Sequence, residues 1–457
     1  MVFSSVIFLF FFLPAVYIAY CLCPGIKMKN ALLILASLSF YAFGEPMYLI
    51  LMVLSILVNY VIARLIAGYQ SGSRIFLCMA VVFNLGLLVI FKYATLFVQT
   101  IGGLLGGQPS FPEIALPIGI SFYTFQALSY CIDVYRDREL VQKNVWKLML
   151  YISFFPQLIA GPIIKYHDIE KYLSDRAVTI EDAAVGIRRF ISGLGKKLLI
   201  ANTMAYIVDT LYTTQMNMAL TAWVSAVCYI FQIYFDFSGY SDMAVGLGRM
   251  FGFTFQENFQ YPYISTNIRE FWHRWHISLS TWFKEYLYIP LGGNRNGEVR
   301  TMRNKLVVFM ATGIWHGANW TFLLWGLFHG LFMILEDKGW VPPKNRIFAH
   351  TYTMLVIICG FVIFRADTVG QAVHILGAMF TGFQMEAFEV MMLAKLLTPW
   401  HAVCVIAAAV LSTPVSCMLK QKIKNEIVFY AASVALLVAC IMELASGSYN
   451  PFIYFRF

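Results

Sequence analysis

Two histidine-containing motifs are the parts of this sequence best suited to chemistry. The first is GIWHGANW at 313–320, where His316 lies between two tryptophans in a run, 307–335, without any Asp, Glu, Lys or Arg. The second is FWHRWHIS at 271–278, which holds two further histidines. A titratable side chain inside a long apolar run is costly in lipid and indicates a functional site by default. His316 is therefore the first candidate for catalysis.

The chemistry that suits His316 is general base catalysis on a hydroxyl group. A histidine has an ordinary pKa near 6.5, so it can accept a proton at neutral pH. On this residue alone, a neutral structural histidine bonded to a neighbouring helix remains an open alternative. The flanking Gly317 and Asn319 favour function, because glycine permits close approach and an asparagine amide can hold a ring or a substrate carbonyl.

Other chemistries fit the sequence less well. His273 and His276 are three residues apart, and no HExxH arrangement accompanies them, which disfavours a metal site. FSGYSD at 237–242 is not a G-x-S-x-G nucleophile elbow, and GLGRMFGF at 246–253 matches neither phosphate-loop spacing. The nine cysteines are an odd number without paired spacing, so they predict neither disulfides nor zinc. We expect no metal and no bound cofactor.

The composition indicates which class of protein positions these histidines. Of 457 residues, 60% are hydrophobic and 12% charged, with a mean hydropathy of +0.70. Soluble domains have roughly 45–50% apolar and about 25% charged residues. The chain is therefore expected to be an all-α polytopic membrane protein. Uncharged runs long enough to cross a bilayer are 1–26, 46–63, 75–91, 93–112, 114–132, 148–164, 210–235, 347–364 and 396–419.

The charges between these runs predict the topology. Lys27, Lys29, Arg64 and Arg74 place the first loops in the cytoplasm, with the N-terminus and Glu45 outside. The first run lacks a basic start and a cleavage site, so it is read as a span and not a signal peptide. The net charge of +9 then reflects topology, with no nucleic acid implied. No repeat or long polar linker interrupts the series, which favours a single membrane domain over 1–457.

The segment 256–305 is charged and aromatic between two apolar halves, and we expect it to be a cytoplasmic amphipathic or re-entrant region. A helical wheel over 271–285 gathers the large apolar side chains on one face, with His276 at its edge and His273 on the polar face. The apolar members are Phe271, Trp272, Trp275, Leu279, Trp282 and Phe283. A basic rim suited to an anionic substrate consists of Arg269, Arg274, Lys284 and Arg295.

Two further positions bear on depth in the membrane. His316 lies eleven residues beyond Lys305, so a continuous helix would place it roughly 16 Å from the cytoplasmic interface, near the bilayer midplane. Asp236 and Asp242 lie at the end of a long apolar run. They face either a cavity or the membrane interface, and both readings remain open.

Both motifs belong to a longer resemblance. The chain resembles the bacterial membrane-bound O-acyltransferases, in their alginate O-acetyltransferase branch. The matching stretches are FLFFFLPAVYIAY, LSFYAFGEPMYL, ALPIGISFYTFQALSYCIDVYR, YISFFPQLIAGPI, FISGLGKKLLIAN, YFDFSGYSDMAVGLGRMFGF, NIREFWHRWHISLSTWFKEYLYIPLGGNR, GIWHGANWTFLLWGLFHG and the closing PFIYFRF. A sibling branch transfers D-alanine to teichoic acid.

The resemblance implies a ring of about 11 transmembrane helices, with short tilted and amphipathic helices, around a central tunnel. It implies that His316 is catalytic and that His276 is a second catalytic histidine. We expect the substrate path to be lined by Trp315, Asn319, Trp320, Trp272, Trp275, Asp236 and Tyr240. The acyl donor would be a cytoplasmic thioester, acetyl-CoA or an acyl carrier protein. The acceptor would be an extracytoplasmic polysaccharide, reached directly or through an SGNH-type acetyltransferase or relay protein, at a bacterial cytoplasmic membrane.

Three alternatives remain open. The acyl group could be D-alanyl, passed to teichoic acid. The protein could be a proton-coupled transporter that uses His316 and Asp236, which predicts solute uptake without an acyl donor. It could be a non-catalytic scaffold, which predicts that replacing His316 leaves acetylation intact.

Overall fold

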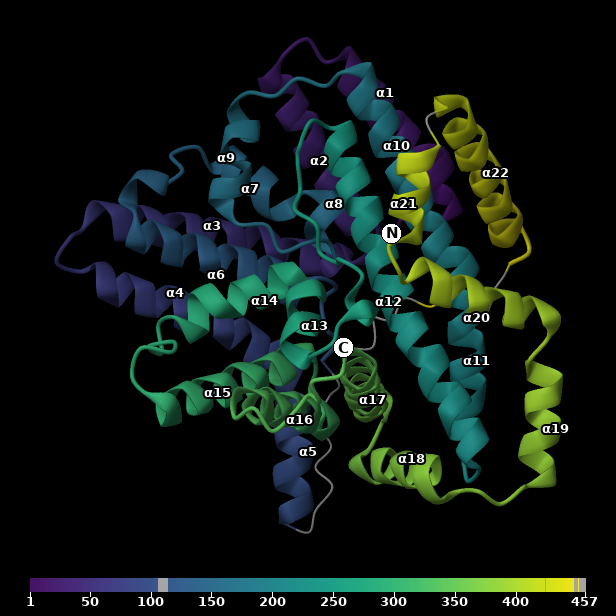
Figure 1. The fold of residues 1–457 in the computed structure, drawn as a ribbon. Helices are drawn as coiled ribbons and strands as arrows, with labels where there is room; N and C mark the ends of the chain where they lie inside the picture. The colour runs from purple at the N-terminus through teal and green to yellow at the C-terminus, as the bar shows by residue number, and fades with distance from the viewer. Residues whose placement is uncertain (106–113, 424, 448–450, 452–457) are drawn as a thin grey trace. The chain divides into compact units, whose positions relative to one another are not determined.

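The computed structural model describes residues 1–105, 114–423, 425–447 and 451, and within these ranges the secondary structure is helical, without strands. Apart from Pro451, the closing PFIYFRF motif lies outside the described residues, as does the end of the predicted span 93–112. The chain divides into two compact units. Unit 1 comprises Met1–Phe190 and Ser241–Gln256, and unit 2 comprises Ile191–Tyr240 and Glu257–Phe457 (Figure 1). The expected single domain over 1–457 stays a prediction.

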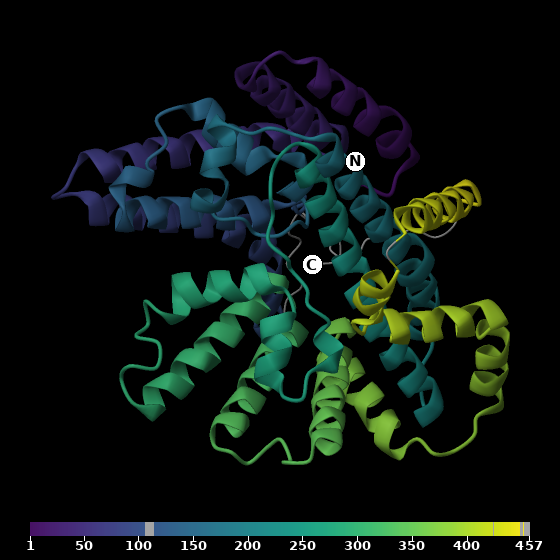
Figure 2. The same ribbon diagram turned by 45° about the horizontal axis from the view of Figure 1, so that its top comes forward.

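Unit 1 is built from helices that pack both with their neighbours in sequence and with more distant ones. Helices α3, α4 and α6 pack against one another, and α2 packs against α3 and α7 (Figure 2). Asn59 and Asn84 exchange side-chain hydrogen bonds of 3.2 and 2.7 Å between α3 and α4, which satisfies two buried amides inside an apolar pair. Its helices are α1 (Leu13–Leu22), α2 (Ile26–Gly44), α3 (Pro46–Gly68), α4 (Ser73–Leu88), α5 (Ala94–Leu104), α6 (Ile120–Arg136), α7 (Val145–Ser153), α8 (Phe155–Leu158) and α9 (Tyr166–Ser174). Short π or 3₁₀ turns lie at Phe8–Phe12, Val89–Tyr93 and Arg138–Leu140.

The run 148–164 is not a spanning helix, so that prediction is wrong. It contains the end of α7, the single turn of α8 and a non-helical stretch, because Pro156 and Pro162 interrupt the helical hydrogen bonding. Every residue of the run is buried. The Tyr151 hydroxyl donates to the Ile164 carbonyl at 2.8 Å, which satisfies part of the irregular backbone. Irregular backbone at membrane depth is tolerated only when protein covers it in this way.

Two long helices, α10 (Ile180–Gly195) and α12 (Ala219–Met250), contribute residues to both units. With 32 residues, α12 is about 48 Å long, more than a bilayer core requires. It begins at Ala219, nine residues beyond the start of the predicted run 210–235. The buried Glu389 carboxylate accepts hydrogen bonds from the backbone N–H groups of Asn217 and Met218, at 2.8 and 3.2 Å, just before this helix starts. A carboxylate is favourable at a helix N-terminus, so Glu389 fixes where α12 begins.

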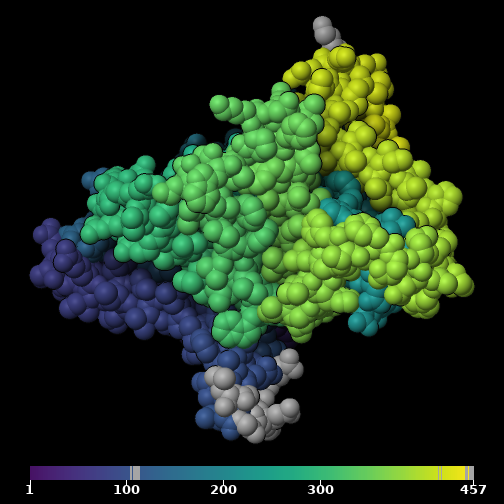
Figure 3. All heavy atoms as spheres, turned by 60° about the horizontal axis from the view of Figure 1, so that its bottom comes forward, coloured from purple at the N-terminus to yellow at the C-terminus, as the bar shows by residue number. Residues whose placement is uncertain are grey.

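Unit 2 contains a helical hairpin of α15 and α16, followed by α17 and α18, which pack in succession (Figure 1). Helices α18 to α20 curve around α11 (Figure 1). In Figure 3 the yellow-green atoms of this region border a hollow, inside which teal atoms are visible. The remaining helices are α11 (Asn202–Tyr212), α13 (Ile268–Arg274), α14 (Ile277–Phe283), α15 (Glu298–His316), α16 (Trp320–Asp337), α17 (Arg346–Arg365), α18 (Val369–Thr381), α19 (Ala387–Leu396), α20 (Pro399–Leu411), α21 (Val415–Lys422) and α22 (Glu426–Ala445). Short π or 3₁₀ turns lie at Lys196–Ala201, Pro262–Ile264 and Lys284–Tyr288.

Six helices of the described chain are long and apolar enough to cross a membrane. They are α2, α3, the continuous Ser73–Gly102, α12, α17 and α22. A seventh span is formed if α19 and α20, which meet at a 77° bend, are counted as one broken segment. The protein is thus an all-α membrane protein. The expected number of about 11 spans stays a prediction.

Candidate active site

The α15–α16 hairpin positions His316 at a helix end. Helix α15 terminates at His316, and Gly317 continues in an extended conformation. The hairpin is tightly packed: a Cβ atom on Gly313 would lie 2.3 Å from the carbonyl oxygen of Phe322. Glycine is therefore required at this contact. The side chain of Asn319 caps α16 by accepting a hydrogen bond from the Thr321 N–H at 3.1 Å.

A sharp turn between α13 and α14 positions His276. The prediction of one continuous amphipathic helix over 271–285 is wrong, because the helix breaks at Trp275 and His276. The backbone of His276 has φ 45° and ψ 54°, a left-handed conformation that costs energy for a residue with a side chain. The face assignment from the wheel nevertheless agrees with the structure: His276 is 2% exposed, whereas His273 is exposed.

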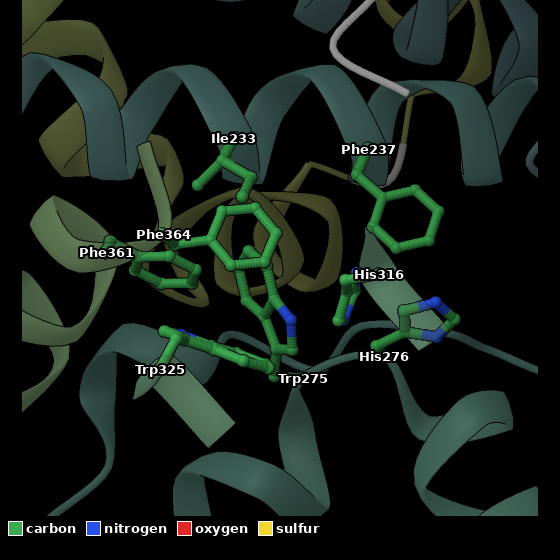
Figure 4. A pocket seen from close by; sticks show the side chains of 8 residues that line it. All are labelled: Ile233, Phe237, Trp275, His276, His316, Trp325, Phe361 and Phe364. Carbon is green, nitrogen blue, oxygen red and sulfur yellow. The ribbon is translucent and has the colours of Figure 1, made fainter. Parts of the chain in front are cut away.

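These segments bring the two histidines into one apolar cavity (Figure 4). His316 lies at its centre, with His276 beside it. The rings of Trp325 and Phe364 both pack edge-on against His316, with centroids 5.1 Å away. Five of the eight lining residues are Phe or Trp, so the cavity is predominantly apolar: Ile233, Phe237, Trp275, His276, His316, Trp325, Phe361 and Phe364.

Each wall of the cavity follows from helix periodicity. Ile233 and Phe237 are four residues apart on α12 and point into the cavity together (Figure 4). Phe361 and Phe364 are three residues apart on α17 and form a second wall. All the lining residues belong to unit 2. The cavity is therefore defined within one compact unit.

The His276 imidazole is buried without polar compensation. Phe237 packs edge-on against it with ring centroids 4.6 Å apart, and neither ring nitrogen has a hydrogen-bond partner among the described residues. His276 lies outside the candidate spans, and burial lowers the pKa of its imidazole to about 3. The ring is therefore neutral at physiological pH, with one nitrogen able to donate and the other to accept. Unsatisfied buried polar groups are costly and suggest that a ligand completes the site.

The residues predicted to line the substrate path lie in different places. Trp275 lines the cavity, and Trp315 is buried between the histidines, with ring centroids 5.0 Å from His316 and 6.2 Å from His276. Trp272 packs against Trp325 at 5.5 Å, next to the cavity.

The other predicted lining residues are not among those that line the cavity. Trp320 is 51% exposed on the surface of α16. Asn319 serves as the helix cap and also donates to the Asp367 carbonyl at 2.8 Å. Tyr240 is buried, and Asp236 forms an ion pair with Lys197 at 2.7 Å, with both side chains 3% exposed.

The predicted basic rim divides into two pairs. Arg269 forms an ion pair with Asp337 at the start of α13. Arg274 forms an ion pair with Glu270 at the end of the same helix. Lys284 and Arg295 are exposed and form no ion pair among the described residues. No three His, Cys, Asp or Glu side chains gather to hold a metal ion in the searched part of the chain.

Sequence reasoning missed several residues of this region. His329 is buried between Trp272 and Trp325, with ring centroids 5.1 and 5.2 Å away. Its spacing of four residues from Trp325 was a usable signal, because i and i+4 side chains share a helix face. Phe237 and Phe364 carried no local signal, since they come from helices far away in the sequence.

Comparison with known proteins identifies the class to which this site belongs. Residues 136–363 match the model of the MBOAT, membrane-bound O-acyltransferase family. Together with full-length relatives, this shows that the chain belongs to that family and is a membrane O-acyltransferase.

The relatives are bacterial. A Pseudomonas putida protein described as a probable alginate O-acetylase is 38% identical over the whole of both chains. A peptidoglycan O-acetyltransferase of Helicobacter pylori is 36% identical over 83% of this chain and 80% of its own length. A teichoic acid D-alanyltransferase of Bacillus subtilis is 29% identical over 66% of this chain and 81% of its own length.

Proposed function

We propose that this protein transfers an acetyl group from a cytoplasmic thioester to the hydroxyl of an extracytoplasmic acceptor, with His316 as the catalytic base. The observation that carries the proposal is the meeting of His316 and His276 in one apolar cavity, although forty residues separate them in sequence. The alginate and peptidoglycan O-acetyltransferase relatives support acetyl as the acyl group and a polysaccharide as the final acceptor.

The reaction is an acyl transfer in which His316 carries one proton. The His316 imidazole removes the proton from the acceptor hydroxyl while the hydroxyl oxygen attacks the thioester carbonyl carbon. The new C–O bond forms, the C–S bond breaks, and the proton passes from the imidazolium to the leaving thiolate. The products are an O-acetyl ester and a free thiol. The surrounding Trp325 and Phe364 exclude water, which would otherwise hydrolyse the thioester.

His276 is suited to a different task from that of His316. Because its ring is neutral and buried, an N–H of the imidazole can donate a hydrogen bond to the thioester carbonyl oxygen, where negative charge develops. A hydrogen-bond donor in a water-excluded site stabilises such charge more than it would in water. On this proposal, His316 moves the proton and His276 stabilises the oxyanion.

The sidedness of the site is also part of the proposal. The basic loops around Lys27 and Lys284 face the cytoplasm, and the N-terminus lies outside, in a bacterial cytoplasmic membrane. The exposed Lys284 and Arg295 then lie where an anionic donor, acetyl-CoA or a phosphopantetheine carrier protein, would arrive. A secreted SGNH-type acetyltransferase or relay protein is the expected recipient on the other side.

The test is acetyl transfer in sealed inverted membrane vesicles that contain the protein. Vesicles receive radiolabelled acetyl-CoA, or acetyl-carrier protein in a parallel reaction, and acid-stable label on polymer or protein inside the lumen is measured. The proposal predicts label in a stable ester and release of free thiol in equal amounts. Vesicles with the His316→Ala protein at equal abundance serve as the control.

Two results would overturn the proposal. If the donor label remains on the thioester while an added solute accumulates in the vesicles, the protein is a transporter. If D-alanyl-carrier protein is consumed and acetyl donors are not, the acyl group is D-alanyl. The second outcome is favoured by relatives of lower identity, two teichoic acid D-alanyltransferases that are 29% and 28% identical over 66% and 50% of this chain.

A further inference from the structure

The turn that presents His276 requires support from outside its own segment. His276 is the N-cap residue of α14, yet its side chain makes no capping hydrogen bond. Its ring lines the cavity beside Phe237 (Figure 4) and makes no capping bond, so the first N–H groups of α14 have no acceptor from the N-cap side chain. The left-handed backbone adds a cost that surrounding contacts must offset. A partner elsewhere in the chain must therefore hold this turn.

That partner is Asn258, which is 1% exposed and lies eighteen residues before His276. The Asn258 carbonyl oxygen accepts a hydrogen bond from the Ile277 N–H at 3.0 Å. Its side-chain Oδ1 accepts from the Ser278 N–H at 3.1 Å and from the Ser278 hydroxyl at 3.0 Å. The first two amides after His276 are thus both satisfied by one residue.

Asparagine is among the residues preferred for capping a helix in its own chain segment. Here the same chemistry is supplied from a distant segment, because the local N-cap position is occupied by a histidine needed in the cavity. A second contact brackets the turn: the Gln260 N–H donates to the Arg274 carbonyl at 2.9 Å. The two segments therefore run side by side and hold the turn on both sides of His276.

We infer that Asn258 is a positioning residue for acyl transfer, which acts by holding His276 in its left-handed turn. The inference rests on the proposed function, since it gives His276 a part in that reaction. Asn258 is not among the residues that line the cavity, so it acts through His276 and not on the substrate. Its loss should lower kcat, because fewer molecules hold the His276 ring in place, and should leave donor KM nearly unchanged.

The size of the effect follows from the energetics of capping. Loss of an asparagine cap shifts a local conformational equilibrium by roughly 2-fold to 30-fold, with about fivefold typical. Asn258→Ala should therefore lower kcat per folded enzyme about fivefold. Asn258→Asp keeps an oxygen that accepts from Ser278 and replaces the Nδ2 amide, which has no partner among the described residues, with a second oxygen whose charge the two Ser278 hydrogen bonds favour. That variant should recover most of the lost kcat.

The experiment compares four proteins in the acetyl-transfer assay: wild type, Asn258→Ala, Asn258→Asp and Asn267→Ala. Asn267 is the matched control, because its side chain caps the neighbouring α13 by accepting from the Glu270 N–H at 2.7 Å. Folded enzyme is counted by size-exclusion chromatography in detergent, so that lost protein is not mistaken for lost catalysis. The expected result is a fall in kcat of about fivefold for Asn258→Ala, with both other variants within about twofold of wild type.

A second measurement tests whether Asn258 acts through His276. In a His276→Asn background, adding Asn258→Ala should change kcat by less than twofold. The inference fails if Asn258→Ala retains wild-type kcat per folded enzyme, if Asn267→Ala loses as much, or if the two changes multiply in the double variant. A wild-type protein that transfers no acetyl group refutes the proposed function instead, before the variants are compared.

Discussion

The buried ion pair between Lys197 and Asp236 gives a prediction whose size follows from its geometry. The Nζ and Oδ1 atoms are 2.7 Å apart and each side chain is only 3% exposed, so solvent screens the pair little. Removing one member takes the buried counter-ion away from the other, which costs about 3–5 kcal/mol. Lys197→Met should therefore lower the midpoint of thermal unfolding by about 6–20 °C, at roughly 2–4 °C per kcal/mol.

Replacing both members should restore most of this stability. A Lys197→Met, Asp236→Leu protein buries no unpaired charge, and such replacements are often neutral or stabilising. We expect its midpoint within about 4 °C of wild type, with acetyl transfer retained. The assay is thermal unfolding in detergent followed by size-exclusion chromatography, with activity measured on the same samples. If the double variant is as unstable as the single one, the pairing argument is refuted. If it is stable but inactive, the charged pair takes part in acetyl transfer and is not merely structural.

Three further predictions concern the hairpin, the neutral histidine and the donor side. A Cβ atom on Gly326 would lie 2.3 Å from a backbone oxygen of α15, so Gly326→Ala should lower the stability of the fold by about 1–3 kcal/mol. At Gly330 the added Cβ would meet mainly a leucine side chain that can move, so Gly330→Ala should lower stability less in the same unfolding assay. Because burial keeps the pKa of His276 near 3, its ring loses no proton above about pH 4, and His276→Asn should leave the shape of the pH–rate profile unchanged between about pH 5 and 9. Replacing exposed Lys284 and Arg295 with glutamine should raise donor KM severalfold and flatten its dependence on salt, as measured between about 50 and 300 mM NaCl.

The sequence predicts the membrane class and the burial of His316 because both depend on local composition. An uncharged run around GIWHGANW predicts an apolar environment for His316 whatever its neighbours are. The helical wheel over 271–285 also separates exposed His273 from buried His276, although the helix breaks between these two residues. These are properties of one segment considered alone.

The sequence does not predict the features that depend on distant segments. The aromatic periodicity of 271–285 fits one continuous helix as well as two short ones, and the break is stabilised by Asn258, which lies outside that segment. Trp320 shares the WHGANW motif, but its position at the start of α16 turns it to the surface. Phe237 and Phe364 reach the cavity only through the packing of α12 and α17 in unit 2.

The most direct test of the proposed mechanism is the turnover of His316→Ala, compared with His273→Ala, in the vesicle assay at equal amounts of folded enzyme. His273 is the matched control because it is an exposed histidine of the same cavity-forming motif as His276. A lost general base lowers the rate by at least about 10²-fold, so His316→Ala should fall by that factor while His273→Ala stays within about threefold of wild type. If His316→Ala keeps more than about a tenth of wild-type turnover, His316 is structural and is not the base.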